Sequence, residues 1–191
     1  MVSLGLEKHN HLKWLDRNGR EGNPEVKPFF SKDEDGDPIY TVTVKDEQPK
    51  GSVHLTKTVD DLVTDTDLVD RSDLSKILFV LKAKDDIYSP VDGSLMFAKD
   101  EKITTENSGA VVNTGTEIGK GIFSLSKDGQ LDISNLPMGT GEAKYYFEEV
   151  KTLDGCVLDE AKHSFTFKQN DFTTKNYSKN LNVENKTTHF E

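Results

Sequence analysis

Three residues with complementary chemistry lie on separate stretches of alternating apolar and polar residues: a lysine amine, a carboxylic acid and a primary amide. They are Lys57, Glu149 and Asn185. An amine that attacks an asparagine side-chain amide forms an isopeptide bond and releases ammonia, and a nearby carboxyl group can transfer the protons. A chain that did this would be a covalently locked structural module and not a turnover enzyme.

Alternation predicts that each of these polar residues ends an apolar row on one face of its strand, since side chains at i and i+2 point the same way. The rows are Val53, Leu55 and Lys57; Tyr145, Phe147 and Glu149; and Leu181, Val183 and Asn185. If the three rows face a core, the three polar groups are desolvated together.

Burial would prepare these groups for the reaction, because desolvation lowers the pKa of a lysine and raises that of a glutamate. A neutral amine is a nucleophile, whereas an ammonium is not. We expect a protonated Glu149 to hydrogen-bond the side-chain oxygen of Asn185, polarise the amide and shuttle protons as ammonia leaves. Groups held together also react as if at very high concentration. The alternative is that Lys57, Glu149 and Asn185 are solvated strand residues, since charged residues are seldom buried without a partner.

Four regions carry a resemblance that extends over residues 51–187. They are 51–57 (GSVHLTK), 78–88 (LFVLKAKDDIY), 131–140 (LDISNLPMGT) with 145–155 (YYFEEVKTLDG), and 183–186 (VENK). In order and spacing they resemble the Cna B-type domain of Gram-positive adhesins and pilins, also called the SpaA-type or prealbumin-like domain. The resemblance implies that Lys57 and Asn185 form the isopeptide bond and that Glu149 is the catalytic acid.

The chain departs from the family pattern close to the predicted acid. Cys156 stands where the family usually has tyrosine, and Leu153 where it often has proline. These departures concern the local loop and not the three reactive residues. Glu148 is adjacent to Glu149, but alternation places it on the face opposite Phe147, so we assign the role to Glu149.

The pattern of short strands and turns predicts an all-β fold, an antiparallel Greek-key β-sandwich of the Ig-like or prealbumin-like kind. Asp-Gly pairs at 92–93, 128–129 and 154–155 are typical of turns between strands. Residues 60–75 are predicted to be a short helix or a long loop. The predicted strands are 52–59, 76–84, 93–98, 110–113, 121–125, 130–134, 143–150, 163–168 and 177–186.

We expect three parts along the chain. Residues 1–49 are interpreted as a partial segment, the tail of a preceding repeat, and ordered only in part. Residues 50–187 form the sandwich, and 188–191 begin a following repeat. In residues 29–47 a weak internal repeat aligns Asp46 with Asn185, which makes Asp46 the acceptor of the preceding repeat. The alternative is a generic strand that ends in a polar turn.

Composition restricts the partners. Lys and Arg number 24 and Asp and Glu 34, which gives a net charge of −10. This acidity argues against nucleic acid and anionic membranes as partners. One cysteine excludes an internal disulfide framework. The segment shows no signal peptide, sorting signal or apolar run that would insert into a membrane. The resemblance instead implies a piece of an exported protein, extracellular and attached to the cell wall.

Other constellations do not predict a cofactor or a metal site. The run at 33–37 (DEDGD) lacks the later ligands of a calcium loop, and the five histidines lack zinc spacing. The main hypothesis is therefore a stalk or shaft module whose partners are neighbouring repeats of the same polypeptide. The alternative is an adhesin domain whose loops, such as 60–75 or 99–120, bind a host matrix protein or glycan. A third possibility is a β-sandwich appended to a secreted carbohydrate-active enzyme.

Overall fold

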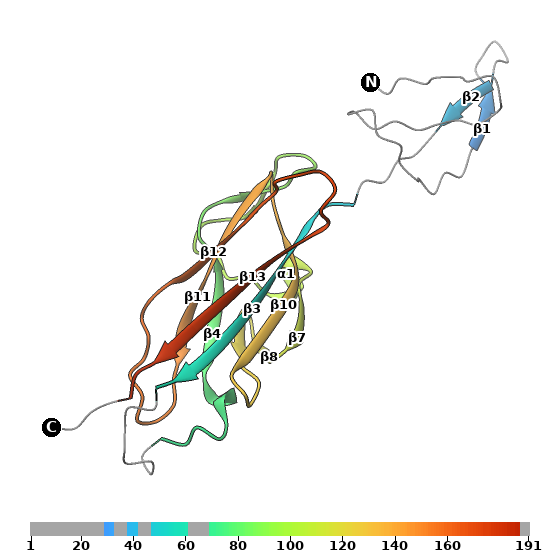
Figure 1. Ribbon diagram of the computed structural model, residues 1–191. Coiled ribbons are helices and arrows are strands. Elements are labelled where there is room, and N and C mark those ends of the chain that lie inside the picture. The colour runs from blue at the N-terminus through green and yellow to red at the C-terminus, as the bar shows by residue number, and fades with distance from the viewer. Residues whose placement is uncertain (1–28, 33–37, 42–46, 61–68, 188–191) are drawn as a thin grey trace. The chain divides into compact units, whose positions relative to one another are not determined.

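The computed structural model describes residues 29–32, 38–41, 47–60 and 69–187 (Figure 1). The chain divides into two compact units, residues 1–47 and 48–191. In the first unit, β1 (Phe29–Lys32) and β2 (Pro38–Thr41) form an antiparallel hairpin. Asp46 and residues 188–191 lie outside the described residues, as do 61–68, so the predicted repeat boundaries remain predictions.

The second unit is built mainly from two large sheets (Figure 1), beside a small two-stranded one. The strands of the two large sheets are β3 (Lys50–Val59), β4 (Leu78–Ala83), β7 (Val111–Thr114), β8 (Thr116–Gly119), β9 (Ile122–Ser124), β10 (Gln130–Pro137), β11 (Glu142–Lys151), β12 (His163–Lys168) and β13 (Asn176–Asn185). One sheet has the order β13-β3-β10-β7, and the other has the order β12-β11-β4-β9-β8. The predicted all-β sandwich is confirmed.

The pairing of β3 with β13 is parallel, whereas the other strand pairs of the two sheets are antiparallel. The first sheet is therefore mixed: the expected antiparallel arrangement holds for the two sheets except at this one pair. Alternation reports which face a side chain takes but not the direction of the strand beside it. Both strands begin at the same end of the sheet, where the amide of Lys50 donates to the carbonyl of Lys175 over 2.9 Å.

The core lies between the inner faces of the two sheets, as the alternating patterns predict. Aromatic side chains of β11 and β12 fill much of it: Phe147 stacks on Phe165 with ring centroids 5.6 Å apart, and Tyr145 stacks on Phe165 at 5.7 Å. The hydroxyl of Tyr145 donates to the carbonyl oxygen of Pro137 over 2.6 Å, so its polar end is satisfied. These contacts fix the row of β11 that ends in Glu149.

Small elements account for the differences from the predicted strands. The predicted strand 76–84 begins later, because a 3₁₀ turn (Leu74–Lys76) precedes it. Two elements have too few residues to show a period: the short helix α1 (Thr105–Ser108) and the two-residue strand β5 (Ile87–Tyr88). β5 pairs with β6 (Leu95–Phe97). Among the described residues, no helix combines the length and the apolar character needed to cross a bilayer.

Candidate functional site

The three predicted residues meet in the interior of the second unit. Lys57 comes from β3, Glu149 from β11 and Asn185 from the end of β13. Their exposed fractions are 1%, 2% and 1%, so all three are as buried as the apolar core around them. Charged side chains are seldom buried to this extent without close partners. The interpretation of these residues as solvated strand positions is therefore wrong.

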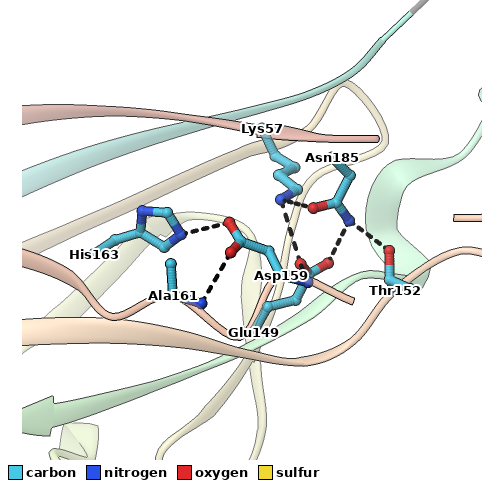
Figure 2. A network of polar contacts seen from close by, with 7 residues as sticks. All are labelled: Lys57, Glu149, Thr152, Asp159, Ala161, His163 and Asn185. Carbon is cyan, nitrogen blue, oxygen red and sulfur yellow. Dashed lines mark hydrogen bonds and ion pairs between the residues drawn. The ribbon is translucent and has the colours of Figure 1, made fainter. Parts of the chain in front are cut away.

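Each of the three side chains contacts the other two (Figure 2). Lys57 Nζ lies 2.5 Å from Asn185 Oδ1 and 3.4 Å from Glu149 Oε2. Asn185 Nδ2 donates to Glu149 Oε1 over 2.8 Å. An amine, a primary amide and a carboxyl group thus form a closed triangle that is buried in the core.

The position of Glu149 against the amide differs from the sequence-based expectation. We expected Glu149 to hydrogen-bond the side-chain oxygen of Asn185. Its carboxyl group instead contacts the side-chain nitrogen, and Nζ of Lys57 contacts the oxygen. One carboxyl group consequently contacts both nitrogens, Nζ of Lys57 and Nδ2 of Asn185. This arrangement suits transfer of a proton from one nitrogen to the other.

Strand register brings Lys57 and Asn185 together diagonally. Asn185 is opposite Val59, and Lys57 is opposite Val183, so the lysine side chain extends forward along the sheet to reach the amide. On the other sheet Glu149 is opposite Phe79, at a point where the pairing of β11 with β4 is irregular. The ring of Phe79 has its centroid 5.5 Å from Lys57 Nζ and forms an apolar wall of the site.

Burial has a direct electrostatic effect on the amine. Desolvation lowers the pKa of Lys57 below its ordinary value of 10.5, and the negative charge of Glu149 opposes this shift, as does that of Asp159 more weakly. A lowered pKa increases the fraction of neutral amine at a given pH, and the neutral amine is the nucleophilic form. The expectation that burial would lower the pKa of this lysine is confirmed.

Two further residues belong to the site and were not found from the sequence. Thr152 Oγ1 accepts a hydrogen bond from Asn185 Nδ2 over 2.5 Å, and the backbone N–H of Asp159 donates to Glu149 Oε2 over 3.1 Å (Figure 2). The carboxylate of Asp159 in turn contacts His163 Nε2 at 2.8 Å. Thr152 and Asp159 lie between β11 and β12, where no periodicity shows which way a side chain points.

The neighbours that depart from the family pattern stay out of this polar network. Leu153 is buried in the core, and the half-buried Cys156 packs against the same core cluster. Glu148 projects away from the site, and its carboxylate contacts Lys82 Nζ at 2.8 Å. In the described part of the chain, no three His, Cys, Asp or Glu side chains are grouped so as to hold a metal ion.

The second unit thus belongs to the class of two-sheet β-sandwich domains and encloses a buried Lys–Glu–Asn cluster. Comparison with known proteins identifies its family. The model of the SpaA prealbumin-like fold domain matches residues 62–182, and the chain belongs to this family. Glu149 lies within the matched stretch, whereas Lys57 and Asn185 lie on either side of it. No curated protein matches the chain.

Three pilins are among the solved structures to which the chain is similar. A minor pilin of Streptococcus agalactiae is 20% identical with a TM-score of 0.44, and the alignment covers 92% of this chain and 59% of that one. The major pilin SpaA of Corynebacterium diphtheriae is 16% identical with a TM-score of 0.46, over 86% and 37% of the two chains. The major pilin subunit of Bacillus cereus is 21% identical with a TM-score of 0.32, over 71% and 28%. The chain thus spans between 28% and 59% of the length of these three proteins.

Proposed function

We propose that residues 50–187 are a stalk or shaft module of a Gram-positive cell-surface adhesin or pilin, locked by an isopeptide bond between Lys57 and Asn185 that the domain makes by itself. The observation that carries the proposal is the buried cluster of Lys57, Glu149 and Asn185, in which the amine lies 2.5 Å from the amide oxygen. Because the fold already holds the reacting groups together, a large part of the entropic barrier to their reaction is removed.

The reaction balances within the side chains present. Lys57 first passes a proton to Glu149 and becomes the neutral amine, which attacks Cγ of Asn185. Glu149 then delivers a proton to Nδ2, with which it is already in contact at 2.8 Å. As the bond between Cγ and Nδ2 breaks, Nζ gives its second proton to the Glu149 carboxylate and keeps one hydrogen as the new amide. Ammonia leaves with three hydrogens, and the proton left on Glu149 passes to the departing ammonia or to solvent. The product is the chain itself, so each molecule reacts once and there is no turnover.

The strands that the bond would join support a mechanical role. β3 is the first strand of the unit and β13 the last, and they are paired along their whole length. In an array of repeats these strands would receive load from the neighbouring repeats on either side. We propose, accordingly, that residues 1–49 belong to a preceding repeat and 188–191 to a following one, on an extracellular, wall-attached protein.

The test of this proposal is the intact mass of the purified protein, followed by peptide mapping. We expect a mass lower than the sequence value by one ammonia and a branched peptide that joins Lys57 to Asn185. The Glu149→Gln variant keeps the size of the side chain but lacks the proton carrier. Its intact mass should therefore equal the value calculated from its sequence, with no loss of ammonia. An unmodified wild-type mass in a folded protein would refute the bond. The adhesin alternative, in which loops such as 99–120 bind a host matrix protein or glycan, would then be tested by a binding assay.

A further inference from the structure

We infer that Asp60 and Thr187 form a latch that sets the register of β13 and so places Asn185 against Lys57. The two are positioning residues, because neither touches the reacting atoms. The inference rests on the proposed function, since it concerns how the same site is assembled. Asp60 follows the last residue of β3, and Thr187 lies two residues beyond β13.

The latch consists of three hydrogen bonds in a buried environment. Asp60 Oδ1 accepts from the backbone N–H of Thr187 and from its hydroxyl, both at 3.0 Å. The backbone N–H of Asp60 donates to the carbonyl oxygen of Asn185 over 2.9 Å. Asp60 is 9% exposed and Thr187 3%. Hydrogen bonds to a charged acceptor away from water are among the stronger ones in proteins.

The segment after β13 is also held from its other side. The backbone N–H of Val157 donates to the carbonyl oxygen of Lys186 over 2.9 Å, and Cys156 forms an isolated antiparallel bridge with Thr187. The residues directly after Asn185 are therefore held on one side by Asp60 and on the other by the loop that follows β11. That loop also carries Thr152, which contacts the amide of Asn185.

A latch is needed because the rest of β13 specifies its register weakly. Of its ten residues only Val183 and Asn185 are buried. Backbone ladder bonds can form in any register, and strands with few buried residues are prone to slippage. A slip of two residues would keep every side chain on its face but move Asn185 by about 6.6 Å along β3, out of reach of Lys57. Asp60 meets Thr187 only when Asn185 is opposite Val59.

The test compares rates of bond formation in newly made protein. Wild type and variants are synthesised in a cell-free system, and the fraction of chains that has lost ammonia is followed over time by mass spectrometry. We expect Asp60→Ala to slow the reaction at least about tenfold, because small misplacements of reacting groups are costly. Asp60→Asn keeps an acceptor oxygen and should restore the rate to within about twofold of wild type. Thr187→Val removes only the hydroxyl bond and should give a smaller slowing.

Asp171→Ala is the matched control. Asp171 precedes β13 at its other end, and its carboxylate accepts from the backbone and hydroxyl groups of Thr173 and Thr174. Its loss removes an exposed carboxylate–threonine contact far along the strand from Asn185, so the rate of bond formation should not change. A folded Asp60→Ala protein that loses ammonia at the wild-type rate would overturn the latch. If Asp60→Ala does not fold, Thr187→Val at the wild-type rate would do the same.

A second measurement separates the latch from the bond itself. In a Lys57→Ala background no bond can form, and amide hydrogen exchange then reports how firmly the end of β13 is held. The latch predicts faster exchange at residues 183–187 in the Asp60→Ala protein than in the Asp60→Asn or Asp171→Ala protein. If wild type does not lose ammonia, the proposed isopeptide bond is refuted. The latch is then tested by this comparison of exchange rates alone. Equal exchange rates would overturn the latch, and a selective increase would support it.

Discussion

At the residue scale, Glu149 contacts both nitrogens of the proposed reaction. One is Nζ of Lys57, which bonds to Cγ of Asn185, and the other is Nδ2, which leaves it. Its own carboxyl group is held by the backbone N–H of Asp159, and the leaving nitrogen is held by Thr152. These contacts orient the groups before any bond changes, so little reorganisation is required during the reaction.

The first prediction concerns the proton carrier. Glu149→Gln should leave the fold intact but reduce bond formation at least about a hundredfold, since a positioned acid–base group contributes on the order of 10²–10⁴ in rate. Glu148→Gln is the control, because Glu148 is the adjacent residue but contacts Lys82 on the other face. Intact mass after timed incubation measures both. Full loss of ammonia from the Glu149→Gln protein at the wild-type rate would show that Glu149 is not the proton carrier.

The second prediction follows from the lowered pKa of Lys57. In the unbonded Glu149→Gln protein the charge that opposes this shift is removed, so the pKa of Lys57 should stay below its ordinary value of 10.5. The unfolded chain should then bind a proton at Lys57 up to about pH 10.5, and the folded chain should release it at lower pH. Stability rises with pH wherever the unfolded state binds more protons. The free energy of unfolding should therefore increase with pH between the folded-state pKa and 10.5, and then level off.

The measurement for this pH dependence is urea unfolding at a series of alkaline pH values. The Lys57→Met/Glu149→Gln double variant lacks the titrating amine, and subtracting its curve removes the contribution of other groups. A difference between the two variants that stays constant with pH would contradict the lowered pKa.

At the element scale, β3 is the strand on which the site depends, and it approaches the second sheet closely at Gly51. A Cβ atom at Gly51 would overlap the ring of Phe167, which is fully buried on β12. Glycine at this position allows the beginning of β3 to pack directly on the aromatic core. The close packing at one end of β3 and the latch at the other together define where Lys57 lies.

The third prediction is that Gly51→Ala destabilises the sandwich by about 1–3 kcal/mol, the usual cost of overpacking a core. Gly119→Ala is the matched control, because Gly119 is also a strand glycine but has no atom within 4 Å of its added Cβ. Both are measured by urea unfolding in the Glu149→Gln background, where the covalent bond cannot mask the change. Equal stability of the two variants would contradict the close approach.

At the scale of the whole unit, the bond would give load a short route through the domain. Force applied at Lys50 and beyond Asn185 would pass along β3 to Lys57, across the bond and out through Asn185. The two bonded residues are separated by 128 positions in the chain. The chain between them, which contains most of the core, would carry no tension.

The fourth prediction is mechanical. Single molecules of wild type stretched from the two ends of the domain should show no unfolding extension from the bonded region. Glu149→Gln molecules should lengthen by roughly 400 Å when the intervening chain is released, given about 3.3–3.6 Å per residue. A wild-type domain that extends as far as the Glu149→Gln domain would contradict the proposed load path.

The fifth prediction is thermodynamic. Closing a loop of 128 residues should stabilise the domain by about 4–5 kcal/mol on the chain-entropy estimate used for disulfides. Wild type should exceed Glu149→Gln by this amount in urea unfolding and should also resist proteolysis for longer. Glu148→Gln, which retains the bond, should match wild type in both assays.

Sequence alone determined the fold class, most strands and the inward direction of Lys57, Glu149 and Asn185. These properties follow from local alternation, which each strand carries within its own few residues. It also distinguished Glu149 from Glu148, because adjacent residues on a strand face opposite ways.

Only the tertiary structure decided the rest. The parallel pairing of β3 with β13 and the contact of Glu149 with the amide nitrogen depend on strands that are far apart in the chain. The same holds for Thr152 and for the pair Asp60 and Thr187, which lie outside the strands. Periodicity describes one strand at a time, whereas register, strand direction and loop contacts arise from packing between segments, which no local pattern encodes.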